Sequence, residues 1–199
     1  MNTSKYKSLV FGKDEIVIEL GCGPYKTKEA IGIDIFEAKE VDIVANLEDG
    51  LQFIPDNSVD KLISKHFLEH VQNLEFLISE IHRILKPGGI HIAIVPHFSN
   101  PYYYSDITHK KNFGLYTFDY YASENSKLKR KVPDFYQTKK FEINKRKLIF
   151  KSPFFFRNYF KKGIQLFVNI GNYTREFYEE CFTGIISCSE IYFEMKALK

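Results

Sequence analysis

Ile16-Val-Ile-Glu-Leu-Gly-Cys-Gly-Pro24, followed by Ala30-Ile-Gly-Ile-Asp34-Ile35, is the stretch that decides the fold. The consecutive apolar residues at its start favour a strand covered on both faces, as in a parallel sheet. Gly21 and Gly23 lack a Cβ, so the backbone turns sharply there and a ligand can approach it closely. Asp34 ends a second apolar strand, where its carboxylate is placed to accept hydrogen bonds from ribose hydroxyls. Because open α/β sheets bind ligands beyond their strand ends, this stretch predicts a nucleoside-containing cofactor.

The spacing within this stretch distinguishes between kinds of nucleotide. A dinucleotide site needs a third glycine in the pattern Gly-x-Gly-x-x-Gly, and that position is Lys26 in this chain. Pro24 and the polar run at 26–29 leave no room for a long helix before the second strand. The chain also lacks the Gly-x-x-x-x-Gly-Lys-Ser/Thr phosphate-binding loop. These features favour a nucleoside cofactor without a pyrophosphate.

Further motifs downstream resemble those of a known family. In order along the chain they are Glu19-Leu-Gly-Cys-Gly23, Asp34, Asn46-Leu-Glu-Asp49, Ile54-Pro-Asp-Asn-Ser-Val-Asp60, Phe67-Leu-Glu-His70 and Arg83-Ile-Leu-Lys-Pro-Gly-Gly89. Over about residues 15–115 the chain resembles the class I S-adenosylmethionine-dependent methyltransferases, in particular the small-molecule, type 11-like methyltransferase domain. The resemblance implies methyl transfer and S-adenosylmethionine as cofactor.

The resemblance also implies which residues contact the cofactor. Ten residues are expected to do so: Glu19, Gly21, Cys22, Gly23, Asp34, Ile35, Asn46, Leu47, His66 and Phe67. In this interpretation residues 19–23 face the methionine portion, Asp34 holds the ribose, and residues 46–47 lie by the adenine. The side chains at 66 and 67, after the fourth strand, line the floor of the site. Position 46 is Asn where the family often has Asp, but an amide both donates and accepts hydrogen bonds.

The hydrophobic pattern predicts an α/β fold with a Rossmann-like, seven-stranded, mostly parallel sheet, an antiparallel C-terminal edge and helices on both faces. Five strands are expected at 16–20, 30–35, 41–44, 59–64 and 90–96, and two antiparallel edge strands at 141–150 and 190–198. An amphipathic helix is expected from Leu74 to Leu85, ended by the Pro and Gly residues of Lys86–Gly89. Residues 154–181 are expected to be helical.

With 199 residues, the chain is expected to form a single domain, 1–199. Its parts are a cofactor-binding half at 1–96, a substrate lid at 97–140, and C-terminal strands with an aromatic and basic helical insertion at 141–199. A loop as long as 97–140 is usually functional in a compact domain. No apolar run is long enough to span a membrane, and the three cysteines have no metal-like spacing. We therefore expect a cytoplasmic, reduced protein.

The substrate side contains the cluster Tyr102-Tyr-Tyr-Ser-Asp106-Ile-Thr108-His109. An alcohol accepts a methyl group poorly unless a base removes its proton, and histidine suits that role near neutral pH. Asp106 and His109 are three positions apart, so the carboxylate can orient the imidazole. His97 leaves the fifth strand at the expected cofactor crevice. His109, His97 and Asp106 are therefore the candidate catalytic residues, against the alternative that they only tie down the lid or that alignment alone carries the reaction.

Two other motifs favour simpler interpretations. His66-Phe-Leu-Glu-His70 matches an inverted zinc-protease pattern, but His66 is expected at a strand end rather than inside a helix. No metal site is therefore expected there. Ser99-Asn-Pro-Tyr102 resembles the loop of base-modifying methyltransferases but follows the wrong strand, so a simple turn is favoured.

Charge is divided unevenly along the chain. The net charge is +3, and residues 110–162 contain 15 Lys or Arg against 4 Asp or Glu. This segment is open to three interpretations: a solvated basic face, a peripheral membrane contact through 154–168, or a site for phosphates of a nucleotide-linked or lipid-linked substrate or of RNA. RNA is the least favoured, because no known RNA-binding module is present.

We expect methyl transfer to the oxygen or nitrogen of a small or carrier-linked molecule, with a sugar phosphate or lipid-linked saccharide favoured. An RNA methyltransferase and a non-catalytic cofactor-binding protein are the alternatives. The sequence does not predict the oligomeric state.

Overall fold

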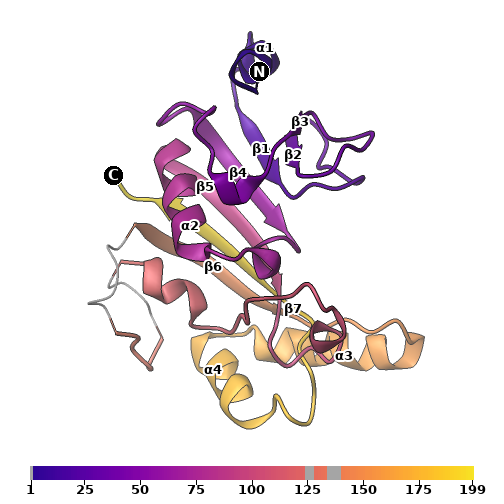
Figure 1. The fold of residues 1–199 in the computed structure, drawn as a ribbon. Helices are drawn as coiled ribbons and strands as arrows, with labels where there is room; N and C mark the ends of the chain where they lie inside the picture. The colour runs from indigo at the N-terminus through magenta and orange to yellow at the C-terminus, as the bar shows by residue number, and fades with distance from the viewer. Residues whose placement is uncertain (1, 124–127, 134–139) are drawn as a thin grey trace.

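A seven-stranded sheet forms the centre of the computed structural model, which describes residues 2–123, 128–133 and 140–199. The strands are β1 (Val17–Leu20), β2 (Ile31–Asp34), β3 (Ile43–Val44), β4 (Val59–Lys65), β5 (Leu85–Pro96), β6 (Phe141–Ile149) and β7 (Glu190–Ala197). They are arranged in the order β3-β2-β1-β4-β5-β7-β6 (Figure 1). The first five strands pair in parallel, and β7 is antiparallel to both of its neighbours. The predicted parallel sheet with an antiparallel C-terminal edge is confirmed.

Within the part of the chain that the structure describes, four helices accompany the sheet: α1 (Asn2–Val10), α2 (Leu74–Ile84), α3 (Phe155–Val168) and α4 (Asn172–Cys181). Short 3₁₀ turns lie at Leu47–Asp49, Leu68–His70, Tyr103–Ser105 and Thr117–Tyr121. In the described ranges, every helix is too short or too polar to cross a bilayer. Figure 1 shows α3 and α4 at one end of the sheet and α1 near the other.

The central strands form because their branched apolar side chains become completely buried. Ile18 and Leu20 of β1 have no exposed surface, and they pair in register with Ile31 and Ile33 of β2. β-Branched side chains pack well in such a sheet, and burying each one contributes about 1.5–3 kcal/mol. These strands place residues 21 and 34 side by side at the edge where both strands end.

Helix α2 follows its predicted bounds closely. Asn73 caps it by accepting a hydrogen bond from the backbone N–H of Phe76 (3.1 Å), and its buried face consists of Leu74, Leu77, Ile78, Ile81 and Ile84. The next strand then begins at once, at Leu85, instead of at the predicted position 90. A register shift in the pairing of β4 with β5 accommodates the Pro-Gly-Gly segment, so the segment belongs to an irregular strand.

Outside the sheet and α2, three segments allow the predicted and the observed helices to be compared. Residues 21–30, between β1 and β2, contain no helix, as the short glycine loop predicts. The predicted helical region at 154–181 is two helices, α3 and α4, separated by residues 169–171. Helix α1 was not predicted, because its sequence is largely polar and only Tyr6 is buried.

The two faces of the sheet are covered unequally. In β5, His91, Ala93 and Val95 are completely buried, whereas the alternate residues Ile92 and Ile94 are only partly buried. Alternation of this kind is typical of a strand packed tightly on one face only. The tightly packed face is the one in contact with α2.

A buried ion pair attaches the segment after β5 to the edge strand β6. Arg146 on β6 donates hydrogen bonds to both carboxylate oxygens of Asp119 (2.8 and 3.0 Å) and to the backbone carbonyl of Leu115 (3.0 Å). Both charged side chains are less than a tenth exposed. Removing one partner of such a pair leaves an uncompensated charge in the interior.

Replacing Asp119 by Ala is therefore expected to lower the free energy of unfolding by about 3–5 kcal/mol, measured by urea denaturation. Asp56→Ala is the matched control, because Asp56 pairs with Arg83 (2.6 Å) while 67% exposed. This control should lower the free energy of unfolding by less than about 1 kcal/mol. Equal losses in the two variants would contradict a structural role for the buried pair.

Candidate active site

A cavity of about 420 Å³ lies at the edge of the sheet where β1, β2 and β4 end. Its lining consists of Gly21, Asp34, Ile35, Phe36, Asn46, Leu47, Glu48, His66, Phe67, His70, Val71, Thr108 and Lys110. Seven of the ten residues predicted to contact a cofactor are in this lining. The sequence analysis did not predict a cofactor contact for residues 36, 48, 70, 71, 108 and 110.

Asp34 holds the two loops that frame the cavity. Its Oδ2 accepts the backbone N–H of Gly23 (2.9 Å), and its Oδ1 accepts the backbone N–H of Phe36 (3.1 Å). A carboxylate has about four acceptor positions. The two backbone bonds therefore fix its orientation and leave acceptor capacity for ligand hydroxyls.

Gly21 brings the first loop close to the floor of the cavity. Its φ of 62° lies in the left-handed region, and a Cβ at this position would come within 2.5 Å of the Phe67 ring. Only glycine satisfies both conditions without strain. The contact explains why a glycine in the first loop and an aromatic residue after β4 line the same cavity.

Three predicted contacts do not line the cavity, and each has a structural task instead. Glu19 is buried, and its carboxylate accepts the backbone N–H of Thr27 (2.5 Å) and pairs with Lys65 (3.2 Å). Cys22 points at β2, and burial raises the pKa of its thiol to about 11. Gly23 donates its N–H to the Asp34 carboxylate. These residues shape the loop rather than touch the cavity.

The expected adenine side contains Asn46 and Leu47. The side chain of Asn46 accepts the backbone N–H of Glu48 (3.1 Å) and so starts a 3₁₀ turn. Glu48 in turn accepts the backbone N–H groups of Gln72 (2.5 Å) and Asn73 (3.3 Å). The sequence analysis placed Glu48 within a family motif without assigning it a role, and the structure makes it the link between this wall and α2.

His66 occupies the floor in a left-handed backbone conformation, with φ at 49°. Its ring nitrogens lie 3.5 Å from Glu69 Oε1 and 3.4 Å from Glu190 Oε1, and Glu190 also binds Lys151 (2.8 Å). The carboxylates of Glu190 and Glu69 raise the pKa of His66 to about 9. The imidazole is therefore a cation at neutral pH, balanced by two carboxylates.

His70 forms a relay with two residues of the predicted lid. The hydroxyl of Thr108 donates to Asp106 Oδ1 (2.6 Å), and this bond keeps the pKa of Asp106 below its ordinary value. Since the hydroxyl has one proton, it accepts from His70 Nδ1 (2.8 Å). The neutral imidazole of His70 then carries its lone pair on Nε2, as a general base requires.

His109 lies beside this relay rather than in the cavity lining. Its Nδ1 donates to the backbone carbonyl of Tyr103 (2.8 Å), and its ring centroid is 4.8 Å from that of His70. Its Nε2 lies 3.6 Å from Asp106 Oδ2. The predicted proximity of Asp106 and His109 is therefore present, but the imidazoles that line the cavity are those of His66 and His70.

Ligating atoms of Glu69, His70 and His109 lie within 4.8 Å of one another, so this group has the donor atoms for a metal ion. Nitrogen and oxygen ligands sit about 2.0–2.2 Å from zinc, so the three side chains would have to move closer to bind one. Glu69 is 1% exposed, and its Oε2 has no hydrogen-bond partner among the residues that the structure describes.

The structure does not place His97 where a base would act. The side chain is completely buried, with Nδ1 2.8 Å from Ser99 Oγ and Nε2 3.1 Å from Glu179 Oε2. Both nitrogens are thus occupied, and His97 is absent from the cavity lining. Because His97 follows the end of β5, the sequence analysis placed it at the cofactor crevice. In the structure the chain turns there and buries the ring against α4.

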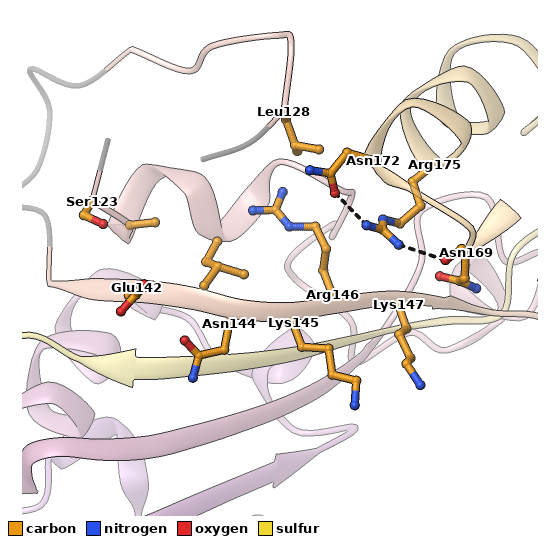
Figure 2. Close-up of a pocket in the computed structure, with 12 residues that line it drawn as sticks. Ser123, Leu128, Glu142, Asn144, Lys145, Arg146, Lys147, Asn169, Asn172 and Arg175 are labelled. Atoms are coloured by element: carbon orange, nitrogen blue, oxygen red, sulfur yellow. Dashed lines mark hydrogen bonds between the residues drawn. The ribbon is translucent and has the colours of Figure 1, made fainter. Parts of the chain in front are cut away.

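The larger cleft in Figure 2, about 900 Å³, lies along the edge strand β6. Its four cationic side chains are divided between the two sides of the strand. Arg146 points toward Asn172 and Arg175, whereas Lys145 and Lys147 point to the other side of the strand (Figure 2). Arg146 is also neutralised by its carboxylate partner. This division favours a solvated basic face over a phosphate site. Residues 124–127 and 134–139 of the basic segment 110–162 lie outside the described residues.

Comparison with known proteins agrees with this geometry. Residues 18–93 match a family model described as a methyltransferase domain. A sterol 24-C-methyltransferase of Pneumocystis carinii is 30% identical over 120 residues, which cover 49% of this chain and 32% of that protein. The chain thus spans about a third of the length of this curated relative.

Solved structures show the same fold. A SAM-dependent methyltransferase from Archaeoglobus fulgidus aligns with a TM-score of 0.56 and 16% identity, covering 98% of this chain and 92% of that one. A methyltransferase of Haloferax volcanii, solved with the Trm112 methyltransferase activator, aligns with a TM-score of 0.56 and 15% identity. The alignment covers 100% of this chain and 89% of that one. The [4+2]-cyclase SpnF aligns with a TM-score of 0.54 and 14% identity, and the alignment covers 99% of this chain and 80% of that one.

Residues 18–93 therefore match a methyltransferase domain, and the whole chain has the fold of the class I methyltransferases. S-adenosylmethionine is the cofactor that this fold family implies. The residues around the cavity fit it, because a carboxylate with free acceptor positions, an apolar wall and a glycine loop lie together there.

Asp34→Asn is expected to weaken S-adenosylmethionine binding at least about tenfold in isothermal titration calorimetry, since hydrogen bonds to a charged group each contribute about 1.5–3 kcal/mol. An amide offers one acceptor oxygen, so it cannot hold both loops and the ribose together. Glu37→Gln, in an exposed position nearby, is the control and should bind normally. Unchanged affinity in the Asp34 variant would contradict the assignment of the cavity.

His66 should titrate near pH 9 in a histidine NMR experiment, and Glu190→Gln should lower that midpoint. Glu194→Gln, on the same strand but hydrogen-bonded to Tyr192, should leave it unchanged. Because the pKa is raised on folding, the stabilisation from protonated His66 is complete below about pH 6.5 and is lost as the pH rises through about 9. The stability difference between the wild type and His66→Asn should shrink over that range, and a flat difference would contradict the ion-pair network.

Proposed function

We propose that this chain transfers a methyl group from S-adenosylmethionine to an oxygen or nitrogen atom of a small or carrier-linked molecule. The observation that carries the proposal is that Asp34, Asn46 and His70 line one cavity. They supply a ribose acceptor, an adenine contact and an imidazole base. The fold alone does not carry it, because a cyclase shares the fold.

His70 is the base in this proposal, and it replaces His97 and His109 in that role. S-adenosylmethionine supplies an electrophilic methyl group and leaves as S-adenosylhomocysteine. As the acceptor oxygen or nitrogen bonds to the methyl carbon, His70 Nε2 takes the acceptor's proton. Thr108 and Asp106 are positioning residues, since they hold the ring through Nδ1 and stabilise the imidazolium that forms.

The acceptor in this proposal carries an anionic group, with a sugar phosphate or lipid-linked saccharide as the favoured class. Lys110 lines the cavity, and protonated His66 forms part of its floor. Cationic side chains of this kind complement a phosphate. The lid residues that reach the cavity, 108 and 110, are also the ones adjacent to the proposed base.

His70→Ala is expected to reduce turnover about 10²–10⁴-fold while S-adenosylmethionine affinity changes little. Turnover is measured as transfer of tritiated methyl groups to a panel of sugar phosphates and lipid-linked saccharides. Thr108→Val should also lose turnover, and Thr108→Ser should retain it, because only a hydroxyl connects His70 to Asp106. His82→Ala is the control, since His82 bonds the Leu198 carbonyl, away from the cavity.

Three results would contradict parts of this proposal. Wild-type turnover in His70→Ala would remove the base and leave alignment alone to carry the reaction. Loss of turnover on chelation, restored by a divalent cation, would assign Glu69, His70 and His109 to a metal ion instead. Methyl transfer to added RNA, or cofactor binding without any transfer, would overturn the acceptor class or the enzymatic activity, respectively.

A further inference from the structure

Helix α3 exposes an unusual set of large apolar side chains. They form the α3 aromatic face: Phe155, Phe156, Tyr159, Phe160, Leu166 and Phe167. Their exposed fractions run from 62% at Phe167 to 85% at Phe156. A ring covers about 150–250 Å² when buried, so the five rings alone expose on the order of 600 Å². That value is at or above the largest apolar patch of a typical soluble monomer.

These side chains lie on one side of the helix. With 3.6 residues per turn, they occupy an arc of about 140°. The opposite side faces the protein, where Val168 is buried, Gln165 accepts the backbone N–H of Phe150 (2.9 Å) and Lys161 donates to the Ser187 carbonyl (2.8 Å). The helix therefore packs inward through Val168, partly buried Ile164 and two polar side chains, and its aromatic side chains point outward.

The charged residues of the segment that contains this face all have one sign. Residues 151–175 contain five Lys or Arg and no Asp or Glu. Arg157 and Lys162 are exposed, and by helical geometry they flank the aromatic arc on its two sides. An apolar face bordered by cations matches the interfacial region of a bilayer with anionic headgroups.

The helix is attached at the same edge of the sheet as the cavity. Ile149, the last residue of β6, pairs with Glu190, which also pairs with Pro96 at the end of β5. Glu190 connects His66 on the cavity floor with Lys151, four residues before α3 begins. Figure 1 shows α3 projecting from this end of the molecule.

We propose that the α3 aromatic face docks on an anionic lipid bilayer and turns the cavity edge of the sheet toward it. The partner is the lipid surface itself, recognised by aromatic insertion together with attraction between Arg157, Lys162 and the headgroups. Docking does not depend on methyl transfer. If the proposed function holds, this orientation favours an acceptor carried on a lipid.

The test is cosedimentation of the full chain with vesicles of phosphatidylcholine, with or without phosphatidylserine. The wild type is expected to bind the anionic vesicles about tenfold more tightly, and salt should weaken that binding. Phe156→Ser combined with Phe160→Ser should reduce binding about tenfold or more. Arg157→Gln combined with Lys162→Gln should remove most of the preference for anionic lipid.

Matched controls come from the end of α1. Phe11 is 90% exposed and Lys13 is exposed, and neither lies in the segment 151–175. Phe11→Ser and Lys13→Gln should bind vesicles like the wild type. S-adenosylmethionine affinity, measured without vesicles, should be unchanged in all these variants, so a failure of docking is distinguishable from a failure of the proposed function.

Three results would overturn the docking proposal. One is the absence of binding to anionic vesicles, and another is equal loss of binding in the α1 controls and the α3 variants. The third is a dimer in light scattering that the Phe156 and Phe160 substitutions dissociate, because a second copy would then cover the face.

Discussion

The carboxylate of Asp34 is the constraint on which the site depends. It binds the backbone of the loop after β1 and of the loop after β2, so two loops that contain no helix acquire fixed positions. The β1–β2 loop is further held from below by Glu19, which is buried and bound to Thr27 and Lys65. A glycine loop of this length has little stability of its own. Its order comes from buried and partly buried carboxylates that accept backbone N–H groups. Hydrogen bonds to a charged group are stronger in partly desolvated surroundings than in water.

The second half of the site is built by the segment after β5. The backbone N–H groups of Lys110 and Lys111 donate to the Glu69 carbonyl (2.7 and 3.1 Å), and the Thr108 hydroxyl reaches His70. Two segments nearly 40 positions apart therefore form one wall. The cavity is lined by the imidazoles of His66 and His70, and not by that of His109, which had the more suggestive sequence context. The carboxylate of Asp106 acts on His70 through a hydroxyl, which explains why spacing along the chain indicated the cluster correctly but not the residue at its end.

Helix α3 packs on the protein and yet leaves most of its large apolar side chains exposed. A soluble protein gains stability by turning apolar side chains inward, yet this helix packs inward through Lys161, Gln165 and Val168 and leaves its aromatic residues outside. Side chain-to-backbone hydrogen bonds, together with buried Val168 and partly buried Ile164, hold the helix on the sheet, so its aromatic side chains take no part in that contact. The aromatic residues are thus available for a partner, and the proposed bilayer contact would remove them from water.

The sequence by itself determined the sheet, the short β1–β2 connection, α2 and most of the cofactor cavity, because these depend on local periodicity and on glycine and carboxylate positions next to strand ends. It did not determine α1, whose polar residues give a weak helical signal, or the start of β5, where pairing with β4 draws a Pro-Gly-Gly segment into the sheet. It could not choose among His66, His70, His97 and His109. Only the tertiary structure distinguishes their surroundings, because the availability of an imidazole depends on burial and on partners from distant segments: Glu190 for His66, Thr108 for His70 and Glu179 for His97.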